Sequence, residues 1–95
     1  MKADTLNSDD VLEIKRVMQD RRISYGMLSE ATLSMVSPAT FHRVLNHGVS
    51  PRMHRNTALY IVVLPQVIRA VNVDLGFDHL NRKQKINRIA RAFAL

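Results

Sequence analysis

Apolar residues recur at helical spacing near the start of the chain. They occupy positions i, i+3, i+6 and i+7, which form one face of a helix: Val11, Ile14, Val17 and Met18. The preceding run 8–10 (Ser-Asp-Asp) is typical of a helix start, because its carboxylates would lie near the positive end of the helix dipole. The pattern predicts a first helix from about Ser8 to Arg22.

A second, shorter helix is expected directly after the first. Ser24 can cap it, and its apolar residues extend to about Thr32. The residues expected to face inward are Met27, Leu28 and Ala31.

The triplet Val-Ser-Pro occurs twice, at 36–38 and 49–51. In each copy the serine can cap a helix and the proline can take the first helical position, where no N–H is needed. The first copy predicts a helix from Pro38 to about Asn46, with Gly48 available to end it.

The second triplet predicts a helix from Pro51 into residues 58–64, which are rich in β-branched side chains. A strand at 59–64 is the competing interpretation, because β-branched residues favour strands. Pro65 is expected to end or kink the helix, with residues 66–71 continuing beyond it.

A last helix is expected from Asn81 to Phe93, after a turn at Gly76. Its other faces are strongly basic, and its narrow apolar stripe consists of Ile86, Ile89, Ala90 and Phe93. The whole pattern predicts an all-α fold of about five helices in a single domain spanning residues 1–95.

Composition supports a single small domain. The chain has 95 residues, of which 46% are hydrophobic, and this is enough for one core. It has no cysteine, which excludes disulfide frameworks and thiolate metal sites. The longest uncharged apolar run, 58–68, is far too short to span a bilayer, and no signal-peptide stretch is evident. We therefore expect a soluble cytoplasmic protein without a membrane partner.

The net charge of +6 is unevenly distributed along the chain. Residues 31–73 contain four arginines and no acidic residue, and residues 79–95 contain five basic residues and no acidic one. Two such segments suggest a surface that faces a polyanion. The alternative is that these side chains only solvate helix faces.

The segment 24–48 has the pattern of a helix-turn-helix, in which two short helices are joined by a tight turn and the second enters the major groove of DNA. We place this unit at 24–47. The second helix would bury Phe41, Val44 and Leu45 and would present one outward face, formed by Pro38, Ala39, His42, Arg43 and Asn46.

The run 36–46, VSPATFHRVLN, resembles the recognition helix of the LacI-type repressors. The wider segment is similar to the lambda-repressor-like helix-turn-helix superfamily. Two residues depart from the LacI pattern, since Met35 stands in place of the usual turn glycine and His42 in place of the common serine. The ligand-binding domain of full LacI-type repressors is absent, so the resemblance implies no sugar sensing.

The resemblance implies double-stranded DNA as the partner. Expected base contacts come from Pro38, Ala39, His42 and Arg43. Expected phosphate contacts come from Ser24, Tyr25, Ser37, Thr40, Asn46 and His47. By chemistry, Arg43 can bind guanine O6 and N7, and the Ala39 methyl can touch a thymine methyl.

Nothing in the sequence points to catalysis, a cofactor or a metal. No pair of its four histidines has the i, i+4 spacing of a helical metal site. Asp74, Asp78 and His79 could hold an ion, but a polar surface turn is the simpler interpretation. No Ser-His-Asp set or glycine-rich phosphate loop is present, and we expect no enzyme.

The last helix allows two interpretations. Ile86, Ile89 and Phe93 could form a two-fold dimer interface within a dimerisation helix at 81–93, or the same stripe could fold back on the core of its own chain. We expect the dimer. Together with the helix-turn-helix, it suggests a transcriptional regulator, of the phage or mobile-element repressor type, that binds a palindromic operator.

Two alternatives remain open. The chain could be an antitoxin or adaptor that also binds a protein partner, through residues 58–71 or the C-terminal surface. A further possibility is an acidic protein or RNA bound through the basic tail.

Overall fold

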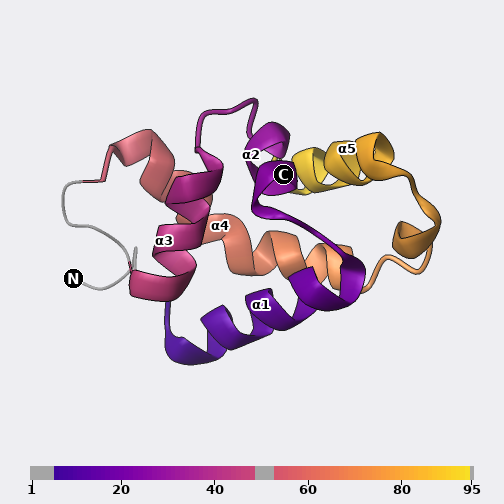
Figure 1. The fold of residues 1–95 in the computed structure, drawn as a ribbon, viewed down its shortest axis with the longest axis horizontal. Helices are drawn as coiled ribbons and strands as arrows, with labels where there is room; N and C mark the ends of the chain where they lie inside the picture. The colour runs from indigo at the N-terminus through magenta and orange to yellow at the C-terminus, as the bar shows by residue number, and fades with distance from the viewer. Residues whose placement is uncertain (1–5, 49–52, 95) are drawn as a thin grey trace.

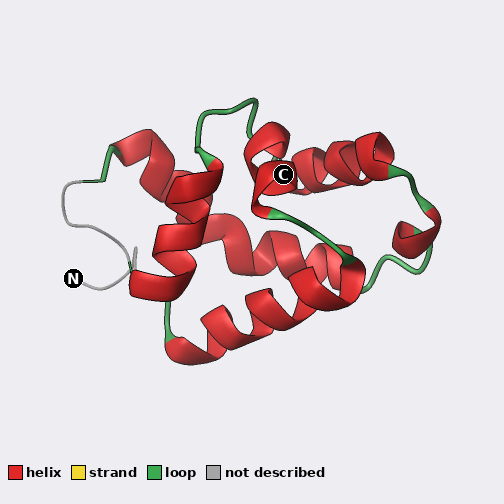
Figure 2. Ribbon diagram, viewed as in Figure 1, coloured by secondary structure: helices red, strands yellow, loops and turns green. Residues whose placement is uncertain are grey.

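A computed structural model of the chain describes residues 6–48 and 53–94. Helices are the only regular secondary structure in these ranges (Figures 1 and 2). A single 3-10 turn, η1 (Phe77–His79), lies between the last two α-helices. The α-helices are α1 (Ser8–Arg21), α2 (Tyr25–Ala31), α3 (Pro38–His47), α4 (Arg55–Asn72) and α5 (Arg82–Phe93). The predicted all-α class and the number of helices are confirmed.

Side-chain caps begin these helices close to where the sequence predicted. The Ser24 side chain accepts a hydrogen bond from the backbone N–H of Met27, and Asn81 accepts one from Gln84. At α1 the cap is Asn7, one residue before the predicted start. Each cap satisfies an N–H that would otherwise lack a partner at the helix start.

The helix predicted to begin at Pro51 begins later. Met53 and His54 are not helical, and the His54 side chain caps α4 by accepting from the N–H of Asn56. The predicted start at Pro51 is therefore wrong, and Ser50 and Pro51 lie outside the described residues.

Residues 59–64 are helical, so the alternative of a strand is wrong. The helix also continues through Pro65, which does not end it. Pro65 has no N–H to donate to the turn before it, but it is buried. Burial of this face against the core favours a continuous helix over an isolated strand with no neighbour to pair with.

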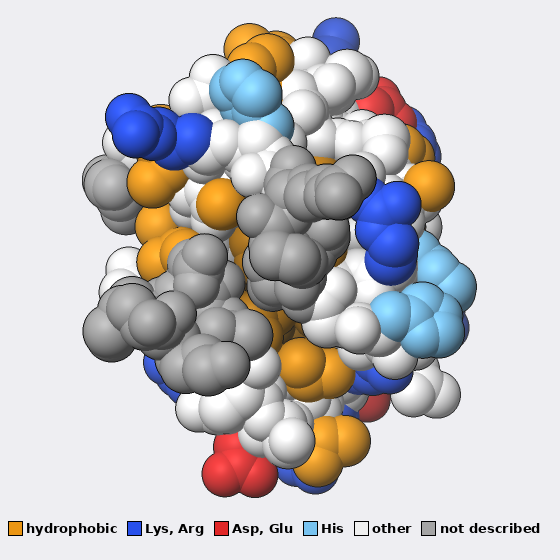
Figure 3. Space-filling view, turned by 90° about the vertical axis from the view of Figure 1, so that its left-hand side faces the viewer, with side chains coloured by type: hydrophobic (Ala, Val, Ile, Leu, Met, Phe, Trp, Pro, Cys, Tyr) orange, Lys and Arg blue, Asp and Glu red, His pale blue; other side chains and the backbone are white. Residues whose placement is uncertain are grey.

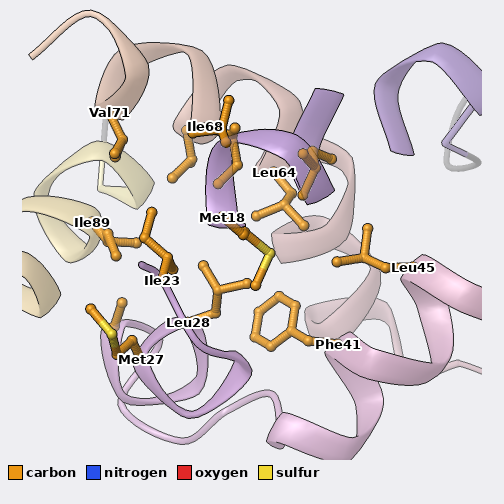
Figure 4. Close-up of a cluster of buried hydrophobic side chains, with 14 of the residues drawn as sticks. Met18, Ile23, Met27, Leu28, Phe41, Leu45, Leu64, Ile68, Val71 and Ile89 are labelled. Atoms are coloured by element: carbon orange, nitrogen blue, oxygen red, sulfur yellow. The ribbon is translucent and has the colours of Figure 1, made fainter. Parts of the chain in front are cut away.

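The five helices pack around one core (Figure 1). α1 lies along α4, and α5 packs against both α2 and α4, while α3 packs against α2. Figure 4 shows side chains from all five helices meeting in this core, with Phe41 of α3 close to Leu28 of α2. Phe41 and Phe77 are fully buried.

The apolar stripe of α5 belongs to this core. Ile89 is 0% exposed, and Ile86 and Phe93 are partly buried against the same cluster. The Phe93 ring also meets the Tyr60 ring edge to face, with centroids 5.5 Å apart. Ile89 is buried inside its own chain and cannot meet a second chain, so the predicted interface cannot form through Ile89, whereas Ile86 and Phe93 keep part of their surface exposed. The alternative, in which the stripe folds back, is the arrangement found.

None of the described helices is long and apolar enough to cross a membrane.

Candidate nucleic-acid interface

α3 has a buried side and an exposed side. Phe41, Val44 and Leu45 lie in the core, as the sequence predicted. All five residues predicted to face outward on this helix are exposed: Pro38, Ala39, His42, Arg43 and Asn46. The core therefore anchors one side of α3 and leaves the other side to solvent.

The start of α3 uses two of the residues predicted to contact phosphate. The Ser37 hydroxyl accepts a hydrogen bond from the N–H of Thr40 at 3.1 Å and lies 2.9 Å from the Thr40 hydroxyl. One hydroxyl proton is used between the two side chains, so the other is available to an acceptor in solution. Ser37 and Thr40 thus combine a capping role with one spare donor.

The turn between α2 and α3 is built without glycine. Leu33 and Ser34 have φ of 57° and 64°, in the left-handed region that glycine normally occupies. Met35, which stands in place of the usual turn glycine, is exposed. The two left-handed residues therefore lie one and two positions before Met35, where the resemblance to LacI-type repressors would place a turn glycine.

The end of α3 is linked to α1 through a lysine that sequence reasoning missed. The Lys15 ammonium donates to the Asn46 side-chain oxygen at 2.7 Å, and the Asn46 amide donates to the backbone carbonyl of His42 at 2.7 Å. No local pattern shows that Lys15, 31 residues earlier, would lie beside α3. Only the packing of the helices brings the two together.

An open hollow of about 410 Å³ lies where α1, α2 and α3 meet. Its polar lining consists of Lys15, Ser24, Tyr25 and Asn46. The structure thus brings together three of the predicted phosphate-contact residues, Ser24, Tyr25 and Asn46, with one added positive charge.

Tyr25 also fixes His42. The two rings meet edge to face, with centroids 5.3 Å apart and planes at 80°. An aromatic contact of this geometry favours one orientation of the imidazole over free rotation. His42 is therefore held in place on the outward face of α3, whereas His47 closes the helix and is exposed.

Much of the basic charge is neutralised within the molecule. Four arginines form ion pairs with acids from distant parts of the chain: Arg21 with Asp78, Arg69 with Asp10 and Glu13, Arg82 with Glu30, and Arg88 with Asp74. The acid-free segments of the sequence are therefore not uniformly basic surfaces.

The residues at α3 differ from these paired arginines. Neither Lys15 nor Arg43 forms an ion pair with any acid in the described ranges. The view onto the α3 end of the molecule shows Lys, Arg and His side chains along its edges (Figure 3). The positive charge that remains available at this end is suited to an anionic partner.

The two acidic residues that follow α4, Asp74 and Asp78, are also paired with arginines. The hydrogen bond from Arg88 holds the pKa of the Asp74 carboxyl below its ordinary value, and Glu30 raises the pKa of Arg82. Asp78 is paired with Arg21. Among the described residues no group of three or more potential ligands could hold a metal ion.

Comparison of this chain with protein-family models, with curated proteins and with solved structures gives no match.

Proposed function

We propose that the protein is a sequence-specific DNA-binding transcriptional regulator of the repressor type, with α3 as the helix that enters the major groove. The observation that carries this proposal is the division of α3. Phe41, Val44 and Leu45 fix one side in the core, while Ala39 and Arg43 are exposed on the other. A recognition helix needs this rigidity on one side and free side chains on the other.

Base reading is assigned to the middle of the outward face. Arg43 carries a planar donor pair that matches guanine O6 and N7, and the Ala39 methyl suits the methyl group of thymine. His42 offers a ring N–H in an orientation limited by Tyr25. Pro38 can add only apolar contact.

Backbone contacts are assigned to the two ends of α3. Ser37 and Thr40 supply a hydroxyl donor at its start, and Lys15 supplies a cation near its end. Ser24 and Tyr25 border the same hollow as Lys15. Such contacts position a protein on the duplex without reading its sequence.

The test compares specific and random duplexes. Duplexes that bind the protein are first selected from a random pool, and the affinity of Arg43→Ala for the selected sequence is then measured beside its affinity for random DNA. We expect specific affinity to fall about 10- to 100-fold, since a bidentate guanine contact contributes about 1–3 kcal/mol of discrimination. Random affinity should fall much less.

Lys83→Ala is the control, because Lys83 is exposed on α5, at the other end of the molecule from α3 in Figure 1. It removes one positive charge and should leave the ratio of specific to random affinity unchanged. Equal losses of both affinities in Arg43→Ala would contradict base reading by Arg43. Failure to select any sequence would contradict the proposed function.

A second candidate, an antitoxin or adaptor, is favoured by one observation. Leu59 and Val62 of α4 are exposed apolar residues within the segment 58–71. A pull-down from the native host would support this candidate if a different protein were recovered at equal stoichiometry.

A further inference from the structure

The outward face of α4 carries no charge. Between Arg55 and Arg69 the helix has no charged residue, although its outward positions face solvent. These positions, spaced three and four residues apart, are Leu59, Val62, Gln66, Ala70 and Val73. A surface helix of a small monomer normally has a charged or polar outward face. α4 therefore presents a face suited to contact with another surface.

Several of the exposed large apolar side chains among the described residues lie on or next to this helix, whereas Leu12 lies on α1. Leu59 and Val62 belong to its outward face, Val73 is the capping residue at its C-terminal end, and Leu75 follows in the next turn. Met35 lines a groove of about 350 Å³ together with Leu59 and Val63. Such clustering marks an interaction site, whereas scattered apolar residues do not.

We propose that a second copy of this chain binds here, with the two α4 helices antiparallel about a two-fold axis close to Gln66. This pairing matches the residues by size, because it sets Leu59 opposite Val73 of the partner and Val62 opposite the small Ala70 of the partner. At the axis the two Gln66 amides meet, and an amide can donate to and accept from its own copy. The face is thus complementary to itself, as a two-fold interface requires.

The charge distribution also favours a second copy. The chain has a net charge of +6, so contact between two of its basic faces is opposed by repulsion. The α4 face avoids this cost, and Arg69 at its edge is already paired with Asp10 and Glu13. Two copies can meet along α4 without bringing unpaired like charges together.

Self-association does not depend on DNA binding, and it is tested without DNA. In sedimentation equilibrium at micromolar concentration the wild-type protein should be a dimer. The double variant Leu59→Glu, Val62→Glu should raise the dissociation constant at least about 100-fold, because each new charge enters the interface twice and lacks a partner. Circular dichroism should show unchanged helix content, since both side chains are exposed.

Leu12→Glu is the matched control. Leu12 is 63% exposed on α1 and Leu59 is 59% exposed on α4. The two changes therefore place the same new carboxylate at similarly exposed positions on different faces. The control should remain a dimer. A dimer that survives the double variant would overturn the proposal, as would a wild-type protein that stays monomeric at submillimolar concentration.

A second measurement locates the axis. The chain has no cysteine, so one introduced cysteine reports a single contact. Gln66→Cys should form a disulfide-linked dimer under mild oxidation, whereas Gln19→Cys, exposed on α1, should not. Equal cross-linking of the two variants, or capture of a different protein by a monomeric wild type at α4, would also overturn the proposal.

Discussion

Two neighbouring residues, Leu33 and Ser34, adopt a backbone conformation that costs an L-residue about 1–2 kcal/mol each. Their N–H groups donate to the carbonyls of Glu30 and Ser29. These bonds end α2 and begin the turn toward α3. The conformation is therefore maintained by the packing of the two helices against each other, at a cost in local stability.

Ser34→Gly should increase the free energy of unfolding by up to about 1 kcal/mol, because glycine adopts positive φ without strain. Part of the gain is offset by the greater freedom of glycine in the unfolded chain. Urea unfolding followed by circular dichroism measures the change. Asn87→Gly, in the middle of α5, should lower stability instead. A loss of stability in both variants would contradict the left-handed conformation at Ser34.

At the scale of elements, the α2–α3 pair depends on one buried polar side chain. The Thr32 hydroxyl donates to the carbonyl of Ser29 at 2.7 Å and accepts from the N–H of Val36 at 3.2 Å. Thr32 is only 2% exposed. It satisfies a buried backbone donor at the point where the chain turns toward α3.

Thr32→Val should lower the free energy of unfolding by about 1–3 kcal/mol, because it leaves the Val36 N–H buried without an acceptor. The valine has the same shape, so packing changes little. Thr32→Ser retains the hydroxyl and should lose less. Denaturant unfolding of both variants measures the difference, and a loss in Thr32→Ser as large as that in Thr32→Val, or larger, would contradict the dominant role of the hydroxyl.

Local pattern predicted the helices and the two sides of α3, because both follow from periodicity within one segment. It did not predict the roles of Ile89 or Lys15, which depend on contacts between segments. The stripe on α5 had the same appearance whether it packed on its own core or on another chain. The start of α4 was wrong for a related reason, since Ser50-Pro51 and His54 offer alternative caps and the sequence pattern gives no basis for choosing between them.

At the scale of the whole molecule, the ion pairs change the meaning of the net charge. Arg82 and Arg88 lie in an acid-free segment of sequence, yet Glu30 and Asp74 from other segments pair with them. Counting basic residues along the chain therefore overstates the positive surface. The positive charge available to an anionic partner is that of the basic residues with which no acid pairs.

This distribution predicts which charges contribute to the salt dependence of DNA binding. Lys15→Ala should reduce the slope of log affinity against log salt concentration by about 0.9, the release expected for one phosphate contact. Arg82→Ala, whose charge is paired with Glu30, should leave the slope unchanged. Titrations from low to moderate salt measure both slopes. A wild-type affinity that does not change with salt would contradict binding to nucleic acid.

The anchoring of α3 has a consequence for how the protein can evolve. Among the described residues no hydrogen bond or ion pair involves the side chain of Ala39 or Arg43, whereas His42 contacts Tyr25 and Asn46 is bonded to Lys15. Ala39 and Arg43 can therefore be replaced over generations with little effect on folding, while His42 and Asn46 can change only together with their neighbours. If α3 reads DNA as proposed, a duplicated gene could acquire a new target preference through these two positions, and its product would still fold as before.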